Sequence, residues 1–136
     1  MPSLFTKLIA GQVPAEFVFQ EPLFVAFLDI SPANPGHVLL VPRAERQYLG
    51  DLPADTLAAL GPSLVRLIAC VKKATGAPAV NVLVNDGPEA NQAVPHAHIH
   101  VIPRHAGDHR LTHPHGTAYR DGEMARMAAK LRAAWA

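Results

Sequence analysis

Cysteine is almost absent from this sequence, since Cys70 is the only one in 136 residues. A single cysteine excludes an internal disulfide, which fits a reducing compartment. The opening stretch, MPSLFTKLIAGQ, is too short and too broken by polar residues to be a secretory signal. We therefore expect a cytoplasmic protein.

Charge of either sign is also scarce, because 17% of the residues are charged and the formal net charge is +1. That balance leaves no basic stripe and no acidic tail, so we expect no nucleic-acid partner. No uninterrupted apolar run reaches the roughly 18 residues that a membrane-spanning helix needs, so we expect no membrane segment. The chain is instead 49% hydrophobic, enough for the core of one globular domain over residues 1–136.

Hydrophobic spacing predicts three helices and five strands. In the longest helix, within residues 53–75, apolar residues recur at steps of three and four: Leu57, Leu60, Leu64, Leu67 and Val71. Shorter helices are expected at residues 3–11 and 121–135, and strands at residues 16–20, 23–30, 37–43, 79–85 and 96–103. Strands that follow one another directly are expected to pair antiparallel. The predicted class is α+β, an antiparallel sheet of about five strands with helices packed on it.

The most unusual stretch is VPHAHIHVIPR, residues 94–104, in which three histidines alternate with apolar residues. In a strand, every second residue points to the same side. His96, His98 and His100 are therefore expected to share one face. The apolar residues between them are expected to lie against the core.

Three explanations fit three imidazole rings on one face. They could be solvated surface histidines. They could bind a metal ion, because imidazole is a frequent ligand, although no carboxylate or cysteine partner lies nearby in the sequence. They could perform nucleophilic catalysis, because imidazole attacks phosphorus and a second histidine can supply a proton to the leaving group. The preceding loop favours the third, since Asn85 and Gln92 carry neutral amides that suit phosphate oxygens.

Four blocks of the sequence resemble the histidine triad hydrolases. HAHIHVI has the family's pattern of three histidines separated by single apolar residues. The other blocks are SLFTKLIAGQVPAEFV, FLDISPANPGHVLLVPR and VNDGPEANQAVP, so the resemblance covers residues 3–108. It implies an enzyme that cleaves a nucleotide at its α-phosphate through a covalent nucleotidyl-histidine. It also implies a homodimer whose sheets join, and we expect no cofactor.

The resemblance implies four catalytic residues. His98 matches the nucleophile, and His100 is expected to contact the phosphate and the leaving group. His96 is expected to support the cluster, with its backbone carbonyl orienting the His98 ring. His37 matches a further histidine that borders the triad.

Six further residues match positions that bind the nucleotide substrate. Asp29 matches the acid that holds the ribose hydroxyls, whereas its own context suggests a turn-forming or capping acid. The others are Phe27, Leu28 and Ile30 around the nucleobase, and Asn85 and Gln92 at the phosphates.

The sequence departs from the family at a metal position. Some relatives hold a structural zinc with a Cys-x-x-Cys pair near the N-terminus and a further histidine. Ser3, Thr6 and Glu45 stand at the corresponding positions here. Their oxygen atoms do not make a tetrahedral zinc site, so we expect no bound metal. The later histidines are expected to lie in a solvated loop outside the site: His105, His109, His113 and His115.

The substrate within the class stays open. His100 stands where the transferase branch of the family has glutamine, which favours hydrolysis. Ala93 stands where phosphoramidate-cleaving relatives often have serine, and together with DGPEANQ it favours dinucleoside polyphosphates over nucleoside phosphoramidates. Two other functions also stay open, a nucleotide-binding or sensing module with little turnover and a histidine metal-binding protein.

Overall fold

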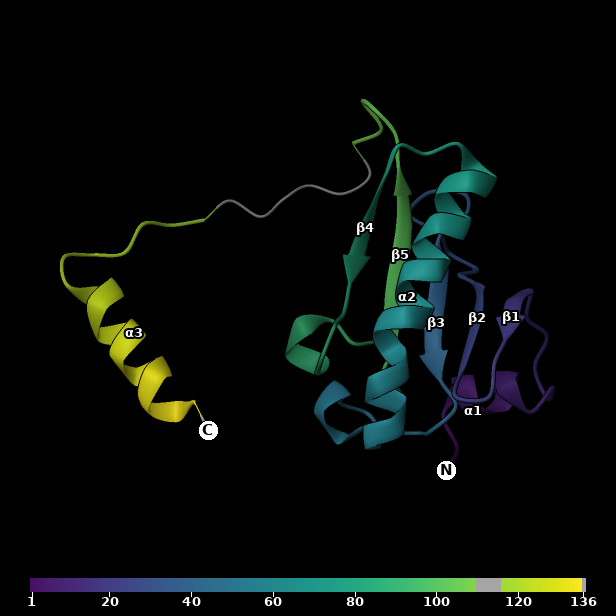
Figure 1. Ribbon diagram of the computed structural model, residues 1–136, viewed down its shortest axis with the longest axis horizontal. Coiled ribbons are helices and arrows are strands. Elements are labelled where there is room, and N and C mark those ends of the chain that lie inside the picture. Colours follow the sequence, from purple (N-terminus) through teal and green to yellow (C-terminus); the bar gives the residue numbers. More distant parts are fainter. Residues whose placement is uncertain (110–115, 136) are drawn as a thin grey trace.

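The computed structural model describes residues 1–109 and 116–135, and its helices and strands follow the predicted order. Figure 1 labels α1 (Leu4–Ile9), β1 (Phe17–Gln20), β2 (Phe24–Leu28), β3 (Val38–Pro42), α2 (Ala54–Thr75), β4 (Ala79–Leu83), β5 (Ile99–Arg104) and α3 (Glu123–Ala134). Short 3-10 turns lie at Leu49–Asp51 and Pro88–Ala90. Ser3 caps α1, as its position in the sequence predicted, because its hydroxyl accepts the N–H of Thr6.

The strands form one antiparallel sheet in the order β1-β2-β3-β5-β4. β3 and β5 are neighbours in the sheet although α2 and β4 lie between them in the sequence. Their register places Leu39 opposite His100. The predicted α+β class and antiparallel five-stranded sheet are confirmed.

Apolar side chains cover both faces of the sheet. One face belongs to a core made of Phe24, Ala26, Val38, Leu40, Leu67, Val71, Ile99 and Val101. The other belongs to a core made of Phe5, Leu8, Val25, Phe27, Leu39 and Val41. Because successive strand residues point to opposite faces, a strand covered on both sides is apolar throughout. β3 is such a strand, since all of its residues are buried.

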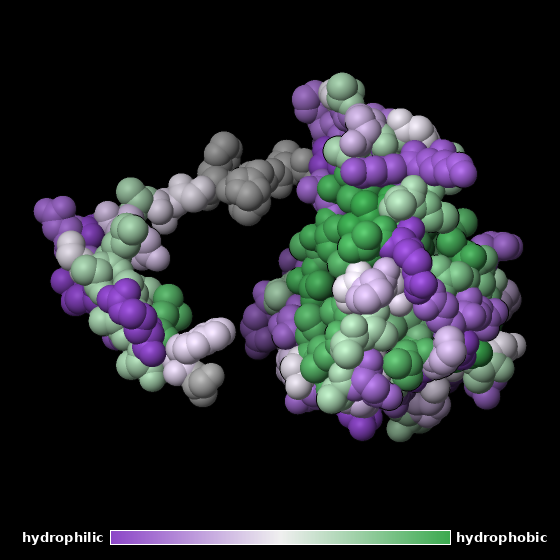
Figure 2. Space-filling model, in the orientation of Figure 1, coloured by the Kyte–Doolittle hydropathy of each residue, from purple (hydrophilic) through white to green (hydrophobic). Residues whose placement is uncertain are grey.

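α2 covers the first of these faces. It is the one helix in the described part of the chain that is long and apolar enough to cross a membrane by length and composition alone. Its Leu67 and Val71 are buried against the sheet, so part of its apolar character serves the core. Leu57 and Val65 are exposed, as are Val82 and Leu83 of β4. Figure 2 shows hydrophobic residues gathered on the side of the body where β4 lies.

α3 departs from the expectation that the helices pack on the sheet. None of its residues is buried, and Figure 1 shows it apart from the sheet and from α1 and α2. Met124 and Leu131 are exposed, and so is Trp135 just after the helix, by 87%. Periodicity predicted the helix because it reports an apolar stripe. It does not report what the stripe packs against.

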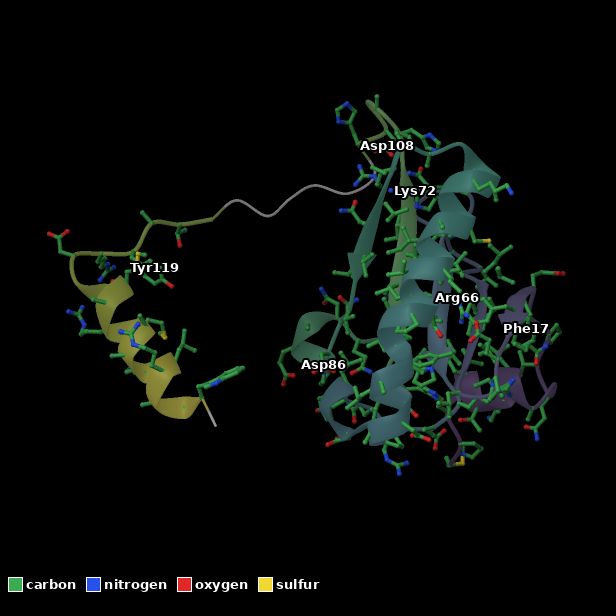
Figure 3. The ribbon with its side chains drawn as sticks, in the orientation of Figure 1. Phe17, Arg66, Lys72, Asp86, Asp108 and Tyr119 are labelled. Carbon is green, nitrogen blue, oxygen red and sulfur yellow. The ribbon has the colours of Figure 1, made fainter. Side chains whose placement is uncertain are left out.

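Hydrogen bonds to Asp108 and Pro103 stabilise the turn that follows β5. The Asn34 amide donates to the carbonyl of Pro103 and to the Asp108 carboxylate, both at 2.9 Å. Figure 3 shows Asp108 at the opposite end of the body from Asp86. His105 and His109 are exposed near this turn, as expected, whereas His113 and His115 lie outside the described residues.

Candidate active site

The three histidines do not lie on one strand face, because β5 begins at Ile99 and His100 alone belongs to it. His96 is fully buried and His98 is only 6% exposed, so the explanation by surface histidines is wrong. The reason is that Phe5 of α1 packs against both of these rings. His98 and His100 line a cavity, whereas His96 is not among the residues that line it.

A backbone carbonyl sets the tautomer of His98. Its Nδ1 lies 2.7 Å from the carbonyl oxygen of His96. A carbonyl oxygen can only accept a hydrogen bond, so Nδ1 carries the proton. The Nε2 atom of the neutral ring is left with a lone pair. The contact expected from the family resemblance is therefore present.

A backbone N–H sets the tautomer of His37 and, through it, that of His100. Ala33 donates its N–H to Nδ1 of His37 at 3.0 Å, so the proton of the neutral His37 ring is on Nε2. That Nε2 lies 2.9 Å from Nδ1 of His100, which must accept and keep its own proton on Nε2. A neutral His100 thus presents an N–H. A second proton on His100 would place its Nδ1–H against the Nε2–H of His37. A second proton on His37 would place its Nδ1–H against the N–H of Ala33.

Burial keeps these rings neutral. It lowers the pKa of His37 and His98, and burial together with the neighbouring His98 and His37 lowers the pKa of His100 to about 4. Asp29 opposes the effect, because its Oδ2 lies 3.6 Å from Nε2 of His37 and its negative charge favours the protonated rings. Desolvation prevails in all three pKa values, so the rings are neutral at about pH 7.

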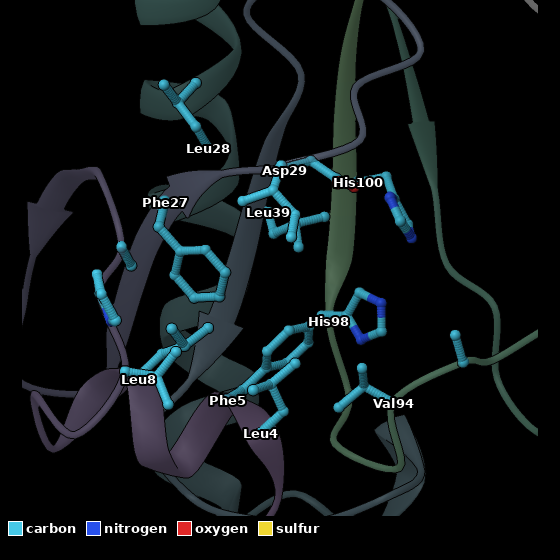
Figure 4. A pocket seen from close by; sticks show the side chains of 15 residues that line it. Leu4, Phe5, Leu8, Phe27, Leu28, Asp29, Leu39, Val94, His98 and His100 are labelled. Atoms are coloured by element: carbon cyan, nitrogen blue, oxygen red, sulfur yellow. The ribbon is translucent and has the colours of Figure 1, made fainter.

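The cavity has a volume of about 310 Å³ and is apolar except at one end. Figure 4 shows His98, His100 and Asp29 among the side chains that line it. The apolar lining includes Leu4, Phe5, Leu8, Val13, Phe27, Leu28, Ile30, Leu39 and Val94. The Phe5 ring stands edge-to-face with Phe27, at a centroid distance of 5.3 Å, and with His98, at 4.9 Å. This shape suits a flat aromatic group attached to a polar, charged one.

The structure brings most of the predicted site residues together. Phe27, Leu28, Asp29 and Ile30 line the cavity, and Ile30 is 95% exposed at its rim. His37 lies behind the lining and contacts it through its hydrogen bond to His100.

Asn85 and Gln92 lie outside the cavity lining. The Gln92 amide closes its own loop, because Oε1 accepts the N–H of Gly87 and Nε2 donates to the carbonyl of Gln47, both at 2.9 Å. Phosphate contact by Asn85 and Gln92 stays a prediction.

Sequence reasoning missed the α1 wall of the cavity. Leu4, Phe5 and Leu8 line it from α1, and Leu39 lines it from β3. In a sequence, apolar residues that line a cavity look the same as residues that fill a core. The available signal was the short amphipathic helix itself, which gave no indication of what it would cover.

One group of side chains has metal-binding geometry in the described part of the chain. The ligand atoms of Asp29, His37 and His100 all lie within 4.8 Å of one another. No carboxylate lies near the three histidines in the sequence, but folding brings Asp29 to His37 and His100. A metal ion here would replace the hydrogen bond between His37 and His100.

The chain belongs to the HIT domain family, which it matches over residues 10–107. It is 37% identical over 105 residues to an uncharacterized HIT-like protein of Methanocaldococcus jannaschii, covering 77% of this chain and 81% of that protein. It is 36% identical over 104 residues to adenosine 5′-monophosphoramidase of Schizosaccharomyces pombe, covering 76% and 75%. It is 35% identical over 104 residues to bis(5′-nucleosyl)-tetraphosphatase of the same organism, covering 76% of this chain and 56% of that protein.

Solved structures share the fold. A HIT family protein from Bacillus subtilis superposes with a TM-score of 0.90 at 24% identity, covering 100% of this chain and 99% of that one. A zinc-bound histidine triad family protein from Mycobacterium smegmatis superposes with a TM-score of 0.74 at 30% identity, covering 97% and 96%. The single HIT fold and the relation to HIT nucleotide hydrolases are thus confirmed.

Proposed function

We propose that this protein is a nucleotidyl hydrolase that cleaves its substrate at the α-phosphate through His98. One observation carries the proposal. Nδ1 of His98 is committed to the His96 carbonyl at 2.7 Å, which leaves the Nε2 lone pair on a ring that lines the cavity. A neutral imidazole anchored in this way is a competent nucleophile.

The proposed reaction has two steps. Nε2 of His98 attacks the α-phosphorus, the bond to the leaving group breaks, and a nucleotidyl-histidine forms. Water then attacks the same phosphorus and the N–P bond breaks, which regenerates the neutral His98 ring and releases a nucleoside monophosphate and a proton to the solvent. His100 donates its Nε2–H to a phosphate oxygen or to the leaving group. Asp29 holds the ribose hydroxyls, and the apolar walls hold the nucleobase.

We propose dinucleoside polyphosphates as the better substrate class. A polyphosphate leaves as an anion, whereas an amine must gain a proton to leave. His100 accepts from His37 and has a pKa of about 4, so it is a hydrogen-bond donor and a poor source of a proton at neutral pH. Ala93 at the cavity supports the same preference.

A single-turnover experiment tests the reaction. The enzyme is mixed with a dinucleoside polyphosphate labelled at the α-phosphate and quenched over time. We expect acid-labile label on the protein before monophosphate is released, and no protein-bound label with His98→Asn. Labelling that persists in His98→Asn would contradict the proposal.

A comparison of kcat/KM between a dinucleoside polyphosphate and a nucleoside phosphoramidate tests the substrate class. We expect the polyphosphate to be turned over at least as well. A hundredfold preference for the phosphoramidate, about 2.7 kcal/mol in the transition state, would overturn this part and leave His98 in its role.

Metal binding is the second candidate function, because Asp29, His37 and His100 have suitable geometry. Metal-free protein is titrated with Zn²⁺ and compared with His37→Ala. One equivalent bound tightly to the wild type and lost in the variant, with no nucleotide turnover, would favour this function. Nucleotide binding without turnover or protein labelling would instead favour the sensing module.

We also propose that the protein is a homodimer joined along β4. β4 is an edge strand, so one side of it has no strand partner among the described residues. Val82 and Leu83 on this strand are exposed, as is Val65 of α2. Sedimentation velocity should show a dimer for the wild type and a monomer for Val82→Lys. A monomeric wild type would contradict the proposal.

A further inference from the structure

A hydrogen-bonded cluster at the start of α1 reaches the histidine triad. We call Ser3, Thr6, Glu45 and His96 the N-terminal clasp. The Ser3 hydroxyl lies 2.7 Å from Nδ1 of His96. Glu45 accepts the Ser3 N–H and, at 2.7 Å, the Thr6 hydroxyl. Three segments far apart in the sequence are thus tied together at one point.

The direction of each hydrogen bond in the clasp follows from its partners. Nε2 of His96 lies 2.7 Å from the carbonyl of Pro42, so the proton of the neutral ring is on Nε2. Nδ1 must then accept, and the Ser3 hydroxyl donates to it. The Ser3 oxygen in turn accepts the N–H of Thr6 at 3.0 Å. Each donor of the clasp therefore has one acceptor.

By the family resemblance, Ser3, Thr6 and Glu45 of the clasp match positions that hold zinc in some relatives, but the donor set of the clasp does not fit zinc. Serine and threonine hydroxyls are not ligands of tetrahedral zinc sites. The side-chain atoms that would have to face an ion are instead hydrogen-bonded to one another, Ser3 to His96 and Thr6 to Glu45. The hydrogen bonds from Ser3 and Thr6 also lower the pKa of Glu45 to about 2, so its carboxylate stays ionised and accepting.

The clasp touches the proposed nucleophile through the main chain. His96 is held at Nδ1 by Ser3 and at Nε2 by Pro42, and its own carbonyl accepts from Nδ1 of His98. Phe5, two residues after Ser3, packs against the His98 ring. Movement of the clasp would therefore move both the carbonyl that orients His98 and the wall beside it.

We propose that the N-terminal clasp is a metal-free replacement for a zinc centre, in which Ser3 and Glu45 are positioning residues that hold the His96 carbonyl in line with His98. The proposal rests on the proposed role of His98. Ser3 and Glu45 touch no substrate and act through His96.

Variants of Ser3 and Glu45 test the positioning role. Ser3→Ala removes the donor to His96, Ser3→Thr keeps it, and Glu89→Ala on the exposed 3-10 turn is a matched control for Glu45→Ala. We expect Ser3→Ala and Glu45→Ala to lower kcat at least tenfold, with a smaller change in KM. We expect Ser3→Thr and Glu89→Ala to stay within about twofold of wild type, a margin well under 1 kcal/mol.

Imidazole ¹⁵N spectra separate positioning from a general loss of stability. In the wild type, we expect His96 to be protonated at Nε2 and His98 at Nδ1. In Ser3→Ala, we expect His98 to show a mixture of tautomers, while circular dichroism stays that of the folded protein. If Ser3→Ala unfolds, the same spectra are recorded on Ser3→Cys, which keeps the shape but weakens the donor. Unchanged His98 spectra and a kcat within twofold of wild type would overturn the proposal.

Zinc itself tests the replacement. The triple variant Ser3→Cys, Thr6→Cys, Glu45→His supplies thiolate and imidazole ligands beside His96. We expect zinc to raise the Tm of the triple variant and to leave the wild-type Tm unchanged. A triple variant that does not respond to zinc would overturn the replacement. Protein labelling that persists in His98→Asn would instead remove the proposed function and leave the clasp geometry to be judged by the spectra.

Discussion

At the residue scale, main-chain groups decide which nitrogen of each histidine carries the proton. The carbonyl of Pro42 fixes the tautomer of His96, and the carbonyl of His96 fixes that of His98. The N–H of Ala33 fixes the tautomer of His37, which in turn fixes that of His100. Pro42 belongs to β3, whereas Ala33 and His96 lie in the segments that lead into β3 and β5. The tautomers are therefore a property of the fold and do not depend on small changes in the solvent.

Replacement of the nucleophile is the most direct test at this scale. We expect His98→Asn to keep the fold and to reduce kcat/KM by at least about a thousandfold, because a covalent path depends on its nucleophile. Steady-state kinetics with circular dichroism measures both effects. A variant that keeps more than about a tenth of wild-type activity would not fit a covalent mechanism at His98.

A variant of Asp29 can separate nucleotide binding from turn formation. Its Oδ1 accepts the N–H of Ser31 at 2.8 Å, a bond that Asp29→Asn can keep. We expect this variant to weaken the binding of a nucleoside monophosphate by about 1.5–3 kcal/mol, because a charged acceptor for the ribose is lost. Isothermal titration measures the change. Unchanged affinity would leave Asp29 with its turn role alone.

The pH dependence of catalysis follows from the neutral state of His98. Its pKa is lowered by burial, and the protonated ring has no lone pair for attack. We expect kcat/KM to fall as the pH is lowered through a value below about 6.5, the ordinary pKa of histidine. Because the rings of His37, His98 and His100 interact, this acid limb of the pH profile reports their joint titration. An acid limb centred above about pH 7 would contradict the lowered pKa of His98.

At the element scale, periodicity predicted where helices and strands form, but not that β5 starts only after His96 and His98. β5 starts at Ile99 because the preceding segment bonds elsewhere, with the N–H of Ala97 donating to the carbonyl of Arg46 at 2.7 Å. Alternating apolar and polar residues are compatible both with a strand and with this non-strand segment. Which of the two forms depends on contacts with α1 and with the chain before α2, and a local sequence pattern does not contain those contacts.

α3 can be tested by deletion. None of its residues is buried, so removing residues 121–136 should change the Tm of the remaining protein by less than about 3 °C. Differential scanning calorimetry at several protein concentrations measures this. A larger drop that depends on concentration would show that α3 is buried against a second copy of the chain.

At the scale of the whole molecule, the sequence predicted the fold and the place of residues 27–30 at the cavity, but not the departure of His96 and His98 from the strand. It did not predict that Phe5 and Leu8 would form a wall, or that Gln92 would use its amide within its loop. These features depend on which segments meet in space. A motif marks the residues that carry chemistry, whereas the surrounding apolar residues take their roles only from packing.

Metal removal tests the whole molecule in one step. The clasp satisfies its own hydrogen bonds, and the proposed chemistry uses imidazole and water. We expect chelators to leave both the Tm and the turnover of the wild type unchanged. A fall in Tm on chelation that zinc restores would show that the protein holds a structural metal.

The clasp also bears on when the site forms during folding. Ser3 and His96 are 93 positions apart, whereas the hydrogen bonds of α2 close within its own 22 residues. Contacts between distant segments cost more chain entropy and form later than local ones. During refolding, the far-ultraviolet helical signal should therefore recover before nucleotide turnover does. A chain that has reached only β4 would have α2 and the first strands but no oriented nucleophile, so catalysis reports completion of the fold.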